Sequence, residues 1–93
     1  MKKSYLLVYN DQFGTREQVK AAIDSCSLVI TWRYDMPHSF YLISEASAKE
    51  LGTKLYEARG SGRFVLTEME HYWGRASKDT WHLVKNKSLR PKQ

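Results

Sequence analysis

The chain of 93 residues is long enough for one domain with a single sheet-and-helix core and too short for two. Hydrophobic residues make up 42% of the chain and aromatic residues 13%, a composition that indicates a folded globule and excludes a disordered chain. The net charge of +5 has its excess at the two ends, because six of the fifteen basic residues lie there and the other nine are balanced by ten acidic residues over residues 4–84.

The first predicted element is a strand over residues 4–9, SYLLVY, whose consecutive apolar positions are typical of a central strand covered on both faces. Residues 10–14 then leave the sheet as a loop. Thr15 and Gln18 have the spacing of a capping box, which predicts a helix from about residue 16 to residue 25. Its apolar stripe has the spacing i, i+3, i+4, i+7 and consists of Val19, Ala22, Ile23 and Cys26.

Residues 30–44, ITWRYDMPHSFYLIS, predict a β-hairpin. Alternation in the first arm predicts one buried face with Ile30, Trp32, Tyr34 and Met36. Pro37 cannot donate to a ladder, and its polar neighbours Asp35, His38 and Ser39 favour a turn, so the chain reverses there. Residues 40–43 form the return strand.

The second half of the chain repeats the pattern of a helix followed by a strand. Ser47 and Glu50 form another capping box, and the stripe that follows consists of Ala48, Leu51, Leu55 and Ala58. Gly60 and Gly62 end the helix, because glycine readily adopts the left-handed conformation of a helix cap. Residues 63–69, RFVLTEM, are the fourth predicted strand.

The order β-α-β-β-α-β predicts an α+β, ferredoxin-like fold, in which a four-stranded antiparallel sheet carries two helices on one face. The strands of Tyr5 and Phe40 are then central, and those of Trp32 and Phe64 are edges. A C-terminal extension begins at about residue 70, and either a short helix capped by Ser77 or Asp79 or a fifth strand fits it; we favour the helix. Residues 1–84 thus form one domain, followed by a basic tail over residues 85–93.

Five sequence patterns suggest a relationship to a known protein family. They are VYND at the end of the first strand, R-x-x-V-K-x-x-I over residues 16–23, SFYLIS over residues 39–44, A-x-E-L-x-x-x-L over residues 48–55 and R-x-V-L over residues 63–66. Over residues 5–69 the chain resembles the small CRISPR-associated adaptation nucleases and the virulence-associated protein D group. The resemblance implies a metal-binding aspartate at the end of the first strand, facing its mate across a dimer. Asn10 stands at that place and Asp11 follows it, so Asp11 is the candidate metal ligand, although both residues also suit a loop without function.

No other chemistry is indicated. The three histidines form no ligand pair, and no phosphate-binding or nucleophile motif is present, so we expect no cofactor and no small-molecule substrate. His38 is interpreted as a solvated turn residue. Cys26 cannot form an internal disulfide because it is the one cysteine, and its place on the helical stripe favours a packed thiol over a nucleophile.

The aromatic residues favour a binding surface. An RNA-recognition module shares this topology and stacks bases on an open sheet face. The residues that could contribute to such a face here are Tyr5, Tyr9, Trp32, Tyr34 and Tyr41. Closure of such a face by a second subunit is the commoner arrangement, since burying aromatic rings is strongly favourable. We therefore expect a homodimer, closed through the sheet face or the fourth strand, unless the C-terminal segment covers its own sheet. The residues predicted for the binding surface are Trp32, Tyr34, Phe64, Trp73 and Trp81.

Because no convergent set of catalytic groups is present, the residues predict a non-catalytic macromolecule-binding protein. The resemblance implies a protein of bacterial or phage type that acts in defence as a protein-binding inhibitor or adaptor. The alternative is a metal-dependent nuclease or nucleic-acid-binding protein of the resembled family. The tail residues Lys85, Lys87, Arg90 and Lys92 can add nonspecific phosphate affinity, although a solubilising role is commoner. No apolar run is long enough to span a bilayer and no signal-peptide pattern occurs, so we expect the protein in the cytoplasm and off the membrane.

Overall fold

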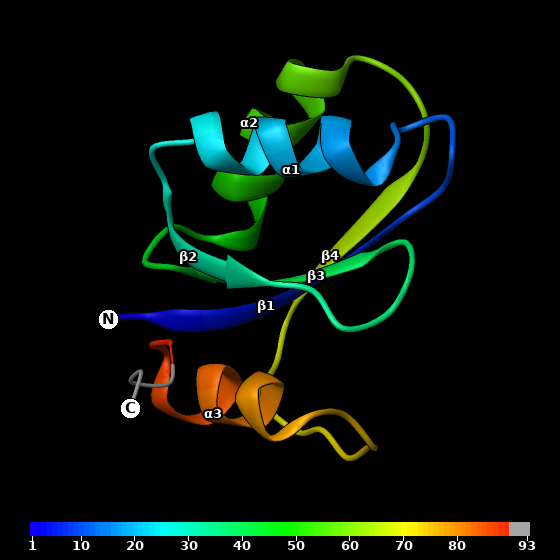
Figure 1. Ribbon diagram of the computed structural model, residues 1–93. Coiled ribbons are helices and arrows are strands. Elements are labelled where there is room, and N and C mark those ends of the chain that lie inside the picture. Colours follow the sequence, from blue (N-terminus) through cyan, green and yellow to red (C-terminus); the bar gives the residue numbers. More distant parts are fainter. Residues whose placement is uncertain (90–93) are drawn as a thin grey trace.

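The protein, seen here as a computed structural model, is described over residues 1–89. Four strands and three helices lie in this part of the chain (Figure 1). In chain order they are β1 (Lys3–Tyr9), α1 (Arg16–Ser25), β2 (Val29–Arg33), β3 (Ser39–Ser44), α2 (Ala48–Arg59), β4 (Phe64–Glu68) and α3 (Lys78–Asn86).

The sheet confirms the predicted ferredoxin-like fold. Its strand order is β2-β3-β1-β4, and every neighbouring pair is antiparallel. The central strand β1 places Leu7 opposite Phe40 of β3 and opposite Leu66 of β4. The strands of Tyr5 and Phe40 are therefore central, as predicted, and β2 and β4 are the edges.

Local signals start and stop the helices as the sequence predicts. Thr15 and Ser47 each accept a hydrogen bond from the backbone three residues on, and both capping boxes are complete. Gly60 ends α2 in the left-handed conformation, with φ of 75°. Gly62 is also left-handed, with φ of 84°, and a Cβ there would overlap the backbone nitrogen of Phe13. Only glycine lets the loop before β4 pass so close to the loop after β1.

The sheet carries a separate apolar cluster on each face. α1 and α2 cover one face and α3 lies against the other (Figure 1). The larger cluster lies under α1 and α2 and includes Tyr5, Leu7, Phe40, Leu42, Leu51 and Leu55. The smaller cluster joins Tyr41 and Ile43 of β3 to Leu83 and Val84 of α3. β3 is thus covered on both faces, and so is β1 apart from Val8, as the apolar positions of residues 5–9 indicated.

The structure corrects the prediction for β2. The strand ends at Arg33 and shifts register between Val29 and Thr31. Such irregularities are commonest at the edges of sheets, where β2 lies. Of the predicted buried face, only Trp32 is half-buried against the larger cluster, while Ile30, Tyr34 and Met36 are exposed.

The C-terminal extension folds back over its own sheet. Ser77 caps α3, so the helix favoured from the sequence is present, and Leu83 and Val84 are buried against Tyr41 and Ile43. Of the two arrangements expected for this segment, the structure therefore has the one that closes the monomer's second face. None of the helices within the described residues is long and apolar enough to cross a membrane.

Candidate protein-binding surface

A cluster of aromatic residues stands on the loop between β4 and α3. Trp73 is 98% exposed, and its neighbour Tyr72 stacks on Trp81 of α3 with ring centroids 5.7 Å apart and an angle of 11° between the planes. Gly74 lies against the edge of the Trp81 ring. Together with Lys85 these residues line a shallow hollow of about 220 Å³, which we call the Trp73 surface.

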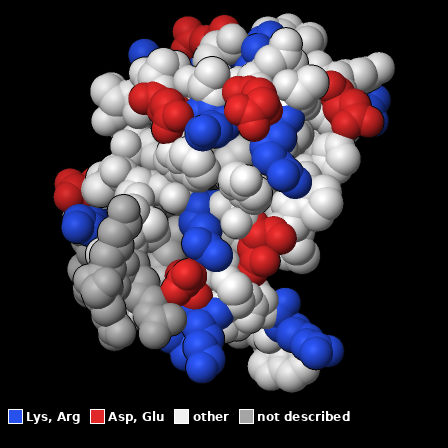
Figure 2. All heavy atoms as spheres, in the orientation of Figure 1, with Lys and Arg blue, Asp and Glu red and all other residues white. Residues whose placement is uncertain are grey.

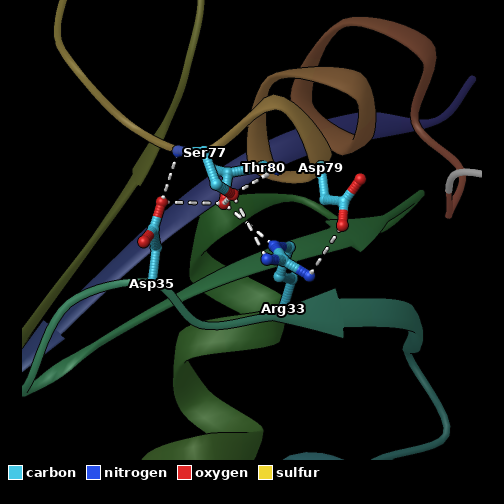
Figure 3. Close-up of polar contacts among 5 residues, drawn as sticks. All are labelled: Arg33, Asp35, Ser77, Asp79 and Thr80. Carbon is cyan, nitrogen blue, oxygen red and sulfur yellow. Dashed lines mark hydrogen bonds and ion pairs between the residues drawn. The ribbon is translucent and has the colours of Figure 1, made fainter.

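A network of polar side chains fixes the start of α3 and so positions the end of this loop (Figure 3). The Asp35 carboxylate accepts hydrogen bonds from the Ser77 backbone N–H at 2.9 Å and from the Thr80 hydroxyl at 3.0 Å. Arg33 donates to the Thr80 hydroxyl at 2.9 Å and to the Ser77 hydroxyl at 3.2 Å. Its guanidinium also lies 3.9 Å from Asp79. This polar latch joins the end of β2 to the first turn of α3.

The latch holds Asp35 in its ionised form. The hydrogen bond from the Ser77 backbone lowers the pKa of Asp35 below its ordinary value of 3.8, and the Thr80 hydroxyl and the Arg33 charge lower it further. The position also suits a carboxylate because the N-terminus of a helix carries partial positive charge. Since all five side chains are used in holding α3, we interpret the latch as a positioning device.

Charge on the surface is mixed. On the face shown in Figure 2, acidic and basic side chains are interspersed, and neither kind gathers into one broad patch. The segment from Glu70 to Lys87 differs, because its basic residues Arg75, Lys78, Lys85 and Lys87 outnumber its acidic residues Glu70 and Asp79 by four to two. The Trp73 surface therefore lies on a locally positive segment.

The residues predicted for the binding surface do not form one site. Trp32 stacks on Tyr34 with centroids 6.3 Å apart at the β2 edge, where Arg16 and Lys20 of α1 lie over the two rings. Phe64 lies on β4 at the opposite edge of the sheet and packs against the larger cluster. Trp73 and Trp81 lie together in a third place, the Trp73 surface.

The candidate base-stacking face is not open. Tyr5 and Tyr9 are buried under α1 and α2, and Tyr41 is buried under α3. Burial raises the pKa of each of these three tyrosines above 10.0. Tyr41 lies opposite Leu6, so it is on the other face from Tyr5 and Tyr9. The alternation of side chains along the strands thus divides these rings between two apolar clusters.

Asp11 has a partner that sequence reasoning missed. Its carboxylate lies 2.5 Å from Nε2 of His38, which stands in the turn after β2 with φ of 61°. The Tyr9 ring is 5.7 Å from the His38 ring. Among the described residues, no group of three or more metal-ligating side chains gathers here or elsewhere. The turn residue His38 is half exposed, as expected. No pattern in the sequence indicated that it joins the turn after β2 to Asp11 in the loop after β1.

The basic residues of the predicted tail divide between two settings. Lys85 lies in the last turn of α3, and Lys87 is its left-handed cap residue. Arg90 and Lys92 lie outside the described residues. Cys26 caps α1 and packs against the larger cluster, as the packed-thiol interpretation predicted.

Comparison of this chain with protein-family models, with curated proteins and with solved structures finds no match. The resemblance to the adaptation nucleases therefore remains a hypothesis.

Proposed function

We propose that this chain is a non-catalytic binding protein that uses Trp73 to anchor a protein partner. The exposure of Trp73 is the observation that carries the proposal. Tryptophan is among the residues most enriched at the energetic centres of interfaces, where its ring enters a pocket on the partner. Here the indole is 98% exposed, yet its neighbour Tyr72 is stacked on α3 and the latch fixes the end of the loop.

The charge around the Trp73 surface specifies the partner further. Lys85 lines the same hollow as the aromatic rings, and the surrounding segment has two more basic than acidic residues. We therefore propose a partner with an apolar pocket for the indole ring and a carboxylate opposite Lys85. The resemblance over residues 5–69 makes components of bacterial or phage defence complexes the first partners to test. We also propose a cytoplasmic location for the protein.

The test is a comparison of two variants in a capture experiment. The full chain is immobilised and exposed to host lysate with and without nuclease treatment, and retained proteins are then titrated individually. Trp73→Ala should weaken binding by about 2 kcal/mol or more, which is at least roughly 30-fold. Ile30→Ala is the matched control, since Ile30 is 49% exposed but lies on β2.

Two outcomes contradict the proposal. Equal retention by the Trp73→Ala and control variants would remove Trp73 as the anchor. Loss of every retained protein after nuclease treatment would favour the alternative role in nucleic-acid binding.

We also propose that the chain forms a homodimer. The support is the β4 edge of the sheet, which pairs with no other strand among the described residues and exposes Val65 by 65%. An unpaired edge of this kind can form hydrogen bonds with a strand of another chain.

A further inference from the structure

The free edge of β4 presents a defined set of backbone groups. The Asn10 N–H donates to the Arg63 carbonyl and the Met69 N–H donates to the Ser4 carbonyl, so residues 63 and 69 point their backbone groups toward β1. Because these directions alternate along an antiparallel strand, Phe64, Leu66 and Glu68 point theirs away from β1. The edge therefore presents the N–H and C=O groups of three residues to a further strand.

The two edges of the sheet differ in their protection. Proteins protect exposed edges with bulges and with charged residues. β2 has a register shift between Val29 and Thr31 and ends in Arg33, which the latch engages. β4 pairs with β1 in unbroken register, and its interior positions are the uncharged Val65, Leu66 and Thr67. The β4 edge is thus the one suited to pairing.

Apolar side chains flank this edge on both faces of the sheet. On the α3 face, Val65 and its cross-strand neighbour Val8 are 65% and 46% exposed. On the other face, Phe64, Leu66 and Tyr56 line a hollow of about 460 Å³ between β4 and α2. A partner strand would cover apolar surface above and below the sheet at once.

We infer that two copies of this chain pair antiparallel through β4, with the two-fold axis at Val65. Residues opposite one another across antiparallel strands lie on the same face, so an axis at a residue of β4 is the arrangement that keeps faces matched. An axis at Val65 sets Val65 against itself and Phe64 against Leu66 of the second copy. An axis at Leu66 would instead set Phe64 against Glu68 and Val65 against Thr67, which places a carboxylate beside an apolar ring.

The Val65 register also uses the backbone groups that the edge presents. Phe64 and Leu66 both point outward, so each faces the other across the axis, and the two pairs form about four hydrogen bonds. Val65 then occupies the closely spaced position without hydrogen bonds, where side chains approach most closely. The three central pairings join apolar to apolar, and Thr67 lies opposite Arg63 of the second copy, so no like charges meet across the axis. The edge is therefore complementary to itself, and this selects a second copy as the occupant. The inference specifies the proposed homodimer and is independent of the Trp73 surface.

Cysteine cross-linking tests the register directly. In a Cys26→Ser background, Val65→Cys places two thiols across the axis with Cα atoms about 4.5 Å apart, within disulfide range. Thr67→Cys is the matched control on the same strand and face. The two copies of residue 67 are offset by four residue positions, or about 13 Å, which is beyond disulfide reach.

We expect light scattering of the unmodified chain to give twice 10.9 kDa at micromolar concentration. We expect oxidation to link Val65→Cys and not Thr67→Cys. Val65→Lys should give a single-chain mass with an unchanged circular dichroism spectrum, because Val65 is exposed in the monomer and two lysines would repel at the axis.

Each contrary result has a separate meaning. A single-chain mass for the unmodified chain would overturn both this inference and the proposed homodimer, and would leave the Trp73 proposal standing. A doubled mass without the Val65→Cys cross-link, or with equal linking of Thr67→Cys, would overturn the β4 register alone. A single-chain mass together with a captured protein lost on Val65→Lys would show that the edge pairs with another protein's strand.

Discussion

Replacing Thr80 by valine should destabilise the protein, although the two side chains have nearly the same shape. Thr80 is fully buried, and its hydroxyl joins the two halves of the latch. It donates to Asp35 at 3.0 Å and accepts from Arg33 at 2.9 Å, while the Ser77 hydroxyl lies 3.1 Å away. Valine fills the same space and removes every one of these contacts.

The expected loss in the free energy of unfolding is roughly 1–2 kcal/mol. A hydrogen bond to a charged group contributes about 1.5–3 kcal/mol, which for two such bonds would suggest more. Asp35 is exposed and the Arg33 side chain is 32% exposed, so water replaces part of each bond in the variant. In a domain of this size, each kcal/mol lowers the melting temperature by about 4–8 °C.

Urea and thermal unfolding followed by circular dichroism measure this loss. Thr53→Val is the matched control, because Thr53 also lies within a helix and its hydroxyl bonds to the Lys49 carbonyl at 2.6 Å, but it is exposed. The control should change the free energy of unfolding by less than about 0.5 kcal/mol. If Thr80→Val costs no more than Thr53→Val, the latch does not stabilise the docking of α3.

Three further predictions concern other residues. Asp35→Asn should destabilise the protein at neutral pH, and the difference in free energy of unfolding from the unmodified chain should vanish as the pH falls below 3.8. The reason is that the pKa of Asp35 is lowered in the folded state, so its stabilisation is lost when the carboxylate is protonated. Urea unfolding at a series of pH values checks this. Gly62→Ala should lower the free energy of unfolding by roughly 3 kcal/mol or more, since a Cβ there overlaps the Phe13 backbone. Gly60→Ala should lower it by about 1–2 kcal/mol, because no atom lies within 4 Å of its Cβ. Similar losses for the two variants in urea unfolding would contradict this reasoning. The proposed binding role predicts no cleavage of RNA or DNA with Mg²⁺ or Mn²⁺, and cleavage that Asp11→Ala abolishes would favour the nuclease hypothesis instead.

The sequence predicted the elements well because their signals are local. The capping residues Thr15 and Ser47 and the stop at Gly60 depend on neighbours within a few positions, and all three act as predicted. The order of those elements then left few topologies, of which the ferredoxin-like one is present.

The candidate site was less predictable because its contacts are distant in sequence. The bonds of Asp35 to Ser77 and Thr80 span 42 and 45 positions, and the pair of Asp11 and His38 spans 27. Polar residues in loops form local turns as readily as they make contacts that are distant in sequence, so the residue type does not show which of these two roles a residue has. Only Trp73 and Trp81 of this surface were predicted from the sequence, as aromatic residues in the extension.

The separation of the two apolar clusters makes the chain's stability uneven. α3 rests on the smaller cluster and the latch, while the larger cluster lies on the opposite face of the sheet. We therefore expect release of α3 to uncover Tyr41 and Ile43 without disturbing the packing of α1 and α2, and we expect the amides of α3 to exchange with solvent through this partial opening. A partner of the kind proposed, which would contact Trp73 and Lys85 together, would bind the form with α3 docked, so by linkage its binding energy would also hold α3 on the sheet. Occupancy of an exposed loop would thereby be measured as slower hydrogen exchange of the amides of α3.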